Sequence, residues 1–142
     1  DHEDNAVLFL APDVAPGMIY KSIMMRDGSW TPPQQTGLRS YGLPIGAVSL
    51  RYGNSSAIAV AYNEHGQAQK LVLALSLDAG KTFPFKKALE DGLPDDSFGS
   101  PAMWQTEDGL LHIVYGYLGQ TIKYRRVTVG WIKLNASCHL WH

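Results

Sequence analysis

The sequence contains few features that would indicate a cofactor, a membrane or a nucleic acid. It has one cysteine, Cys138, so it forms no internal disulfide. No apolar run approaches the roughly 18 residues that a membrane-spanning helix needs. Its 12 basic and 13 acidic residues give a formal net charge of −1, which offers no electrostatic attraction to nucleic acid or to an anionic membrane. No spacing of residues indicates a metal site or a cofactor.

The residues that are abundant indicate a folded all-β chain. Apolar residues make up 45% of the 142 positions, enough for one domain with a sizeable core. Fourteen glycines and eight prolines divide the chain into short pieces, which is typical of strands joined by turns. Alternating runs such as Leu111 to Tyr115 predict half-buried strands. No segment predicts a helix, and no linker separates two domains.

A repeat is visible along the chain. Val7 and Phe9 recur 53 positions later as Val60 and Tyr62, and Trp30 recurs at the same interval as Phe83. A fixed period near 50 with several short strands in each unit is typical of the blades of a β-propeller. The sequence therefore predicts a sheet-by-sheet radial architecture.

Three such units fit into the chain, each expected to be a four-stranded antiparallel blade. Their approximate bounds are residues 4–39, 40–92 and 93–134, and a tail without the pattern occupies residues 135–142. A closed propeller usually has four to eight blades, so three blades would leave open sheet faces at both ends. The sequence is then either a segment of a longer propeller or a half-propeller that pairs with another copy, and it does not choose between them.

One octapeptide, residues 76–83, contains residue types that can stabilise a turn by hydrogen bonds among themselves. Asp78 is placed to accept backbone amides in a turn, Gly80 to adopt a positive φ, and the hydroxyls of Ser76 and Thr82 to close the loop. Phe83 would anchor the turn against the blade. This pattern predicts a stable hairpin and carries no chemistry by itself.

The octapeptide fits the Asp-box pattern, and with its surroundings the chain resembles the sialidase-like BNR/Asp-box repeat family. The resemblance is carried by four segments in the family's order, namely residues 73–84, 100–115, 121–124 and 131–132. It implies a six-bladed propeller of which this stretch is the C-terminal half. It also implies a glycan as the ligand class.

In that family three arginines hold the carboxylate of sialic acid, a tyrosine paired with a glutamate attacks, and an aspartate serves as acid and base. The resemblance places the nucleophile at Ser100 and the third arginine at Ala68, so neither residue is matched. The acidic residue expected near Gly46 is missing as well. An arginine pair after the inner hairpin of the third blade is replaced by Leu118 and Gly119.

Four further side chains are candidates for binding a ligand. They are a basic residue before the second unit, two residues in or after its central loop, and a tyrosine at a strand end: Arg39, His65, Lys70 and Tyr117. Two hypotheses follow. The chain belongs to a catalytically inactive propeller that binds glycan or protein, or it belongs to an active sialidase-type glycoside hydrolase whose remaining machinery lies outside this sequence. The unmatched tyrosine and third arginine favour the inactive propeller, and the active hydrolase and a non-catalytic protein-binding scaffold are the alternatives.

The sequence also bears on partners and compartment. A glycan or glycoconjugate and a second half-propeller are the expected partners, with no nucleic acid. Two glycosylation sequons begin at Asn54 and Asn135. Together with the family resemblance they favour a secreted or lumenal protein.

Overall fold

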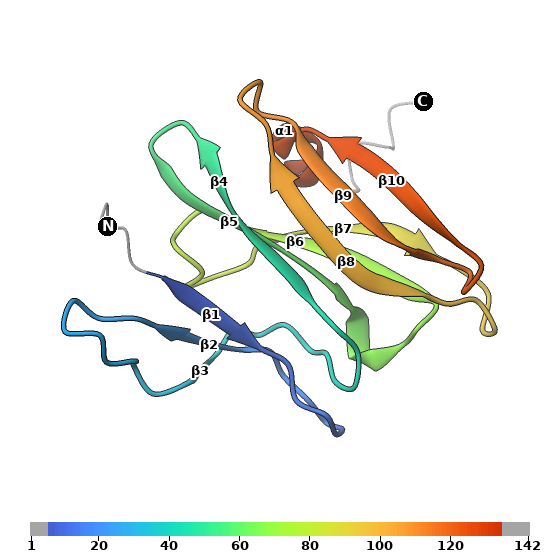
Figure 1. Ribbon diagram of the computed structural model, residues 1–142, viewed down its shortest axis with the longest axis horizontal. Helices are drawn as coiled ribbons and strands as arrows, with labels where there is room; N and C mark the ends of the chain where they lie inside the picture. Colours follow the sequence, from blue (N-terminus) through green and yellow to red (C-terminus); the bar gives the residue numbers. More distant parts are fainter. Residues whose placement is uncertain (1–5, 135–142) are drawn as a thin grey trace.

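The protein, described by a computed structural model over residues 6–134, consists of three antiparallel sheets standing in a row (Figure 1). The predicted all-β class is confirmed. The first sheet contains β1 (Val7–Leu10), β2 (Tyr20–Ile23) and β3 (Gln34–Gln35). The central sheet contains β4 (Gly46–Tyr52), β5 (Ser55–Asn63), β6 (Lys70–Ser76) and β7 (Phe85–Asp91). The third sheet contains β8 (Phe98–Gln105), β9 (Leu111–Tyr117) and β10 (Thr121–Val127).

The sheets have three, four and three strands, whereas four were expected in each. In the first sheet β3 is only two residues long and directly follows Pro32 and Pro33, which have no amide to donate to a ladder. In the third sheet the chain turns into a helix after β10. The Asn135 sequon and the tail at 135–142 lie outside the described residues, and the blade boundaries proposed from the sequence stay a prediction.

The central sheet is buried on both faces because a sheet packs on each side of it. Alternate residues of β5 divide between two apolar clusters. Ile58, Val60 and Tyr62 pack with the first sheet. Ala57, Ala59 and Ala61 pack in a second cluster with Leu111 and Ile113 of β9. This explains why β5 is a continuous apolar run rather than an alternating one.

The sequence repeat describes the second and third sheets better than the first. Tyr62 of β5 faces the first sheet and Tyr115 of β9 faces the central sheet, so both point to the preceding sheet. Phe9 of β1 instead packs edge-on against Phe83, with ring centroids 6.3 Å apart, and so points to the following sheet. The sequence repeat aligns Phe9 with Tyr62, but the two side chains point to opposite sides of their sheets, so this part of the alignment is wrong.

A helix forms where none was expected. The short helix α1 (Val129–Lys133) follows β10, and the hydroxyl of Thr128 accepts a hydrogen bond from the Trp131 amide at 3.0 Å. This side-chain cap satisfies one of the free amides of the first turn. Val129 and Ile132 bury the helix against the cluster between the central and third sheets. Between residues 6 and 134, no helix has the length and apolarity to cross a bilayer.

Candidate functional site

The sheet topology divides the candidate residues between two ends of the sheets. One end carries segment 38–45, the β5–β6 loop 64–69, the β7–β8 loop 92–97 and the β9–β10 turn 118–120. We call it the site end, because all the candidate ligand and catalytic positions lie on or beside these segments: Arg39, His65, Ala68, Lys70, Ser100 and Tyr117. The opposite end, called the turn end, carries the β4–β5, β6–β7 and β8–β9 turns, and therefore the octapeptide.

Asn63, at the end of β5, organises the site end. It is fully buried, and its Nδ2, which carries two hydrogens, donates to the backbone oxygen of Phe98 at 2.8 Å and shares its other hydrogen among the oxygens of Lys70 at 3.2 Å, Gln67 at 3.3 Å and Ala68 at 3.4 Å. The amide of Phe98 in turn donates to the oxygen of Ala68 at 2.8 Å. One side chain thus fixes the central loop against the first residue of β8. The position expected for the third arginine, Ala68, is part of this structural joint.

Arg39 and His65 are brought together by the backbone. The amide of His65 donates to the oxygen of Arg39 at 2.9 Å, and both side chains are exposed. Within residues 6–134 the Arg39 guanidinium forms no hydrogen bond or ion pair. Gly66, with φ of 68°, lies against Tyr41, so that a Cβ at position 66 would be 2.9 Å from the backbone oxygen of Tyr41. Glycine is required at this position by both its φ and its close approach to Tyr41.

Lys70 is already paired. Its Nζ lies 3.1 Å from Glu64 Oε2, and the hydrogen bond and charge of Glu64 raise the pKa of Lys70. A half-exposed pair of this kind contributes little to stability. It does, however, compensate the Lys70 charge, which makes Arg39 the better candidate for contacting an acidic ligand.

Three residues that are not glycine adopt left-handed backbone conformations at the site end. They are His65 with φ of 56°, Ser100 with φ of 49° and Leu118 with φ of 56°. Such conformations cost free energy and are concentrated at functional sites in folded proteins. Ser100 lies in a bulge of β8, since the β8–β9 register shifts between Gly99 and Ala102. The bulge turns the exposed Ser100 out of the strand ladder.

Tyr117 closes β9 opposite Phe98. The two rings are tilted by 50° with centroids 5.3 Å apart, and Lys123 Nζ lies 4.7 Å from the Tyr117 centroid. Tyr117 is therefore half-buried and packs against Phe98 and Lys123. No hydrogen bond joins it to Ser100 in the part of the chain described.

The resemblance predicts an acidic residue near the start of β4, around Ile45 and Gly46, and the structure leaves no room for a side chain at Gly46. A Cβ at Gly46 would lie 2.6 Å from the backbone oxygen of Pro101, a distance that real side chains do not adopt. β4 and β8 approach each other here as neighbouring strands of two sheets. No side chain, acidic or otherwise, fits at this position without displacing the backbone of Pro101.

Two hydroxyl groups near this end are buried without a partner among residues 6–134. They belong to Ser40 and Tyr62, whose side chains are both fully buried. Burial, followed by the charge of Glu64, raises the pKa of Tyr62. Unpaired buried hydroxyls cost about 1–3 kcal/mol each. Neither hydroxyl is accessible to an external ligand, so both are structural features rather than candidate catalytic groups.

The octapeptide at the turn end forms a closed hydrogen-bonded turn. Asp78 accepts hydrogen bonds from Ser76 Oγ at 2.7 Å, from the Thr82 amide at 2.9 Å and from Thr82 Oγ1 at 2.6 Å. Gly80 has φ of 83° and its amide donates to Ser76 Oγ at 2.8 Å. Desolvation raises the pKa of Asp78, but the hydrogen bonds from Thr82 and Ser76 outweigh it and lower the pKa to about 2.

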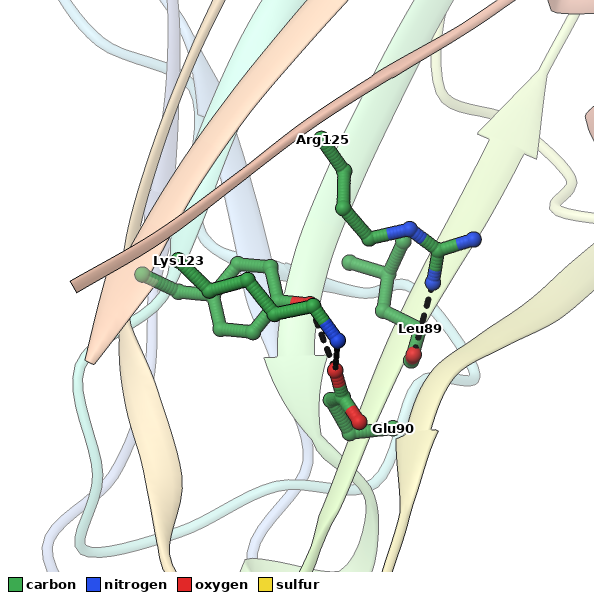
Figure 2. Close-up of polar contacts among 5 residues, drawn as sticks. Leu89, Glu90, Lys123 and Arg125 are labelled. Atoms are coloured by element: carbon green, nitrogen blue, oxygen red, sulfur yellow. Dashed lines mark hydrogen bonds and ion pairs between the residues drawn. The ribbon is translucent and has the colours of Figure 1, made fainter. Parts of the chain in front are cut away.

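A second polar cluster joins the central and third sheets (Figure 2). Tyr115 Oη donates to Glu90 Oε1 at 2.8 Å, Lys123 Nζ donates to the same oxygen at 2.6 Å, and Arg125 donates to the Leu89 oxygen at 2.7 Å. The cluster contains a tyrosine–glutamate pair, but Tyr115 is only 1% exposed. Burial and the bond to Glu90 raise the pKa of Tyr115, so this phenol is a structural group and not a nucleophile.

Several of the residues that build the site end were not among the candidates. Asn63, Glu64 and Tyr41 carry no motif, because their roles depend on contacts with segments far along the chain. The one available signal is an asparagine at the end of a buried apolar strand. A buried polar side chain normally requires several hydrogen-bond partners, and such partners cannot be read from the sequence.

Comparison with known proteins identifies the architecture. No family model matches the sequence, and no curated protein matches it either. Among solved structures, the intramolecular trans-sialidase from Ruminococcus gnavus, in complex with oseltamivir carboxylate, superimposes with a TM-score of 0.72 at 13% identity over 95% of this chain. The fold is sialidase-like. The three sheets are therefore neighbouring blades of a sialidase-type propeller, as the resemblance predicted.

Two other sialidase structures agree with this assignment of the fold. A leech intramolecular trans-sialidase complexed with 2,7-anhydro-Neu5Ac has a TM-score of 0.71 at 12% identity over 93% of this chain. The NanB sialidase from Streptococcus pneumoniae has a TM-score of 0.62 at 12% identity over 89%. This sialidase-like chain spans only 32%, 23% and 22% of the lengths of the three proteins.

Proposed function

We propose that the chain is a glycan-binding segment of a sialidase-like propeller that performs no sialidase chemistry of its own. The observation that carries this proposal is the contact between Gly46 and Pro101, which leaves no room for an acidic side chain at Gly46, near which the resemblance predicts one. The serine at position 100 supports the same conclusion. Both positions come from the family resemblance, and the activity of any longer protein is part of the proposal.

The chemistry of the missing groups explains why turnover should be lost. A retaining glycosidase of this type needs a nucleophile and a paired base that lie on one face of the sugar. A serine hydroxyl is a weak nucleophile unless an adjacent base removes its proton. Within residues 6–134 no histidine or carboxylate is hydrogen-bonded to Ser100. Losing the nucleophile alone costs about a thousandfold in rate or more.

Binding without turnover is favoured by the groups that remain. The site end presents the exposed Arg39 and His65, the half-buried rings of Tyr41 and Tyr117, and the exposed hydroxyl of Ser100. Guanidinium, imidazole and hydroxyl groups donate and accept hydrogen bonds with sugar hydroxyls and carboxylates. The left-handed backbone conformations of His65 and Ser100 also support a binding site here, because such conformations persist only where the surrounding structure holds them and they cluster at functional sites.

A fluorogenic sialoside tests the catalytic half of the proposal. We expect no turnover above the uncatalysed rate, even at high protein concentration. Ser100→Ala is compared with Ser29→Ala, which removes a hydroxyl at the turn end. Turnover that Ser100→Ala abolishes and Ser29→Ala leaves unchanged would contradict the proposal and would favour an active glycosidase.

A gain-of-function variant provides an independent test. Ser100→Tyr returns a phenol to the family's nucleophile position, but we expect no sialidase turnover from it. Gly46 still lacks an acidic group to pair with the phenol, and Ala68 still lacks a guanidinium. Turnover restored by this single change would show that the remaining groups of the site end suffice for the chemistry.

A further inference from the structure

The basic residues of the chain are concentrated on three neighbouring elements. β7, β10 and α1 contain six of the 12 lysines and arginines but only two of the 13 acidic residues. Six positive and two negative charges give these elements a local charge of +4, although the whole chain has a formal net charge of −1. Charge separated in this way favours a negatively charged ligand at one surface, even where the net charge does not.

These elements meet where the central sheet packs against the third sheet. β7 and β10 are edge strands of their sheets, and Arg125 of β10 reaches across to the Leu89 oxygen of β7 (Figure 2). α1 packs against the same junction through Val129 and Ile132. The junction lies between two sheets of the described chain and along their edge strands. It is therefore separate from the outer faces of the first and third sheets, where further sheets of a propeller pack.

Two positive charges lie over the ring of Trp131 in α1. Lys87 Nζ and Arg125 Cζ are both 5.4 Å from the centroid of this ring, which is within the range of a cation–π interaction. Trp131 itself is half-buried and packs on the apolar cluster between the central and third sheets. The fixed indole ring therefore keeps two like charges close together at the surface.

A third cation belongs to the same helix. Lys133 Nζ lies 5.0 Å from the centroid of the Tyr52 ring and 5.8 Å from that of Phe85. It also donates a hydrogen bond to the Tyr52 hydroxyl at 3.2 Å. The aromatic rings thus position this charge as Trp131 positions the other two. We call the surface of these half-buried residues the rim patch: Lys87, Arg125, Trp131 and Lys133.

The cations of the rim patch form no ion pair with a carboxylate among residues 6–134. Lys123, which lies beside them on β10, is by contrast paired with Glu90 at 2.6 Å. Arg125 donates one N–H to the Leu89 oxygen, and a guanidinium has five N–H donors in total. Donors that are already held in place lose little side-chain entropy when they bind an anion, so the rim patch is suited to a negatively charged ligand.

We propose that the rim patch binds a polyanionic sugar chain, which carries sulfate or carboxylate groups along its length. Three separate cations fit successive negative groups better than a single anion, and guanidinium and ammonium groups donate charged hydrogen bonds to such oxygens. The indole of Trp131 adds an apolar surface and an N–H donor for a sugar ring. A single indole favours a sugar chain over single-stranded nucleic acid, because proteins that bind the latter stack successive bases on several aromatic side chains.

The rim patch is independent of the site end. Lys87 pairs with Leu73 and Arg125 pairs with Ile113 in the middle of their strands, whereas the site end consists of loops and turns beyond the strand ends. The proposal therefore does not rest on the glycan binding proposed for the site end. Arg39→Gln, which alters the site end, should leave binding at the rim patch unchanged.

The test is the binding of a fluorescein-labelled, heparin-derived hexasaccharide to the full chain, measured by fluorescence anisotropy. We expect binding that weakens about tenfold or more when the salt concentration rises from about 0.05 M to about 0.5 M. Lys87→Gln should weaken binding about tenfold, and Lys87→Arg, which keeps the charge, should retain it. Lys86→Gln is the matched control, because it removes the same charge from an exposed neighbour on the opposite face of β7.

Four competing ligands separate the sources of the interaction: a polygalacturonate hexamer, neutral maltohexaose, a polyglutamate peptide and a single-stranded oligonucleotide. We expect competition from the polygalacturonate and none from maltohexaose. An oligonucleotide or peptide that binds more tightly than both anionic sugars contradicts the choice of a sugar chain.

The variants decide whether the patch is the site. Equal losses in Lys86→Gln and Lys87→Gln contradict a defined patch and indicate diffuse attraction. A loss in Arg39→Gln but not in Lys87→Gln assigns the sugar to the site end and overturns the proposal. The absence of binding by either anionic sugar at low salt also overturns it. Circular dichroism shows that each variant is folded before its binding is compared.

Discussion

Replacing Asp78 with asparagine isolates the charge that holds the octapeptide turn closed. The carboxylate accepts three hydrogen bonds, one from Ser76 and two from Thr82. Asparagine has the same shape and keeps one acceptor oxygen, so the variant removes the charge without opening a cavity. We expect a less stable protein with an unchanged fold.

The magnitude follows from the pKa of Asp78. A carboxyl whose pKa falls from 3.8 to about 2 on folding contributes at most about 2.5 kcal/mol at neutral pH. Because Asp78 is half-exposed, screening by solvent reduces the expected loss to about 1–1.5 kcal/mol. Asp78→Ala removes all three acceptor contacts and should cost about 2–3 kcal/mol.

The pH dependence has a definite sign. The folded-state pKa lies below the unfolded one, so the contribution is complete above about pH 5 and is lost as the pH falls through 3.8 toward 2. Urea unfolding at pH 7, 5 and 3 measures it, with the exposed Asp95→Asn as control. The difference between wild type and Asp78→Asn should fall to about half at pH 3. Equal stability at pH 7, or a difference that does not change with pH, would refute the reasoning.

Three further predictions concern the core and the contacts between sheets. Gly46→Ala should destabilise the protein by about 2 kcal/mol in urea unfolding, because its Cβ meets Pro101; an unchanged midpoint contradicts the close approach. Glu90→Ala should cost about 2–3 kcal/mol by leaving the Tyr115 hydroxyl buried without its acceptor, and Glu90→Gln should cost less. Since burial raises the pKa of Tyr62 and Tyr115, ultraviolet titration of the native protein should leave two phenols neutral above pH 10, where the unfolded chain ionises and stability falls. Full ionisation without unfolding would contradict their burial.

The strands were predictable from the sequence because their signals are local. Alternation over Leu111 to Tyr115 and the apolar run from Ala57 to Tyr62 lie within β9 and β5. The hydrogen bonds that the side chains of Ser76, Asp78 and Thr82 form within the octapeptide also join residues no more than four positions apart. Composition, turn residues and spacing carry such information directly.

Other features depend on tertiary contacts and were missed for that reason. α1 contains Gly130, which disfavours a helix, and forms because Thr128 caps it and Ile132 is buried. The facing of Phe9 is set by Phe83, far along the chain. At the site end, Arg39 and His65 are joined by a backbone hydrogen bond. Such a bond does not depend on the identity of either side chain, so the sequence pattern does not predict it.

The most direct test of the central claim is one titration of the isotopically labelled protein with 3′-sialyllactose, followed by amide NMR while the sugar signals are recorded in the same tube. We expect shifts confined to site-end amides such as those of His65, Ser100 and Leu118, with Asp78 and the turn end unmoved. The sugar should stay uncleaved throughout. Release of free sialic acid would contradict the loss of chemistry, and an absence of shifts at the site end would contradict glycan binding.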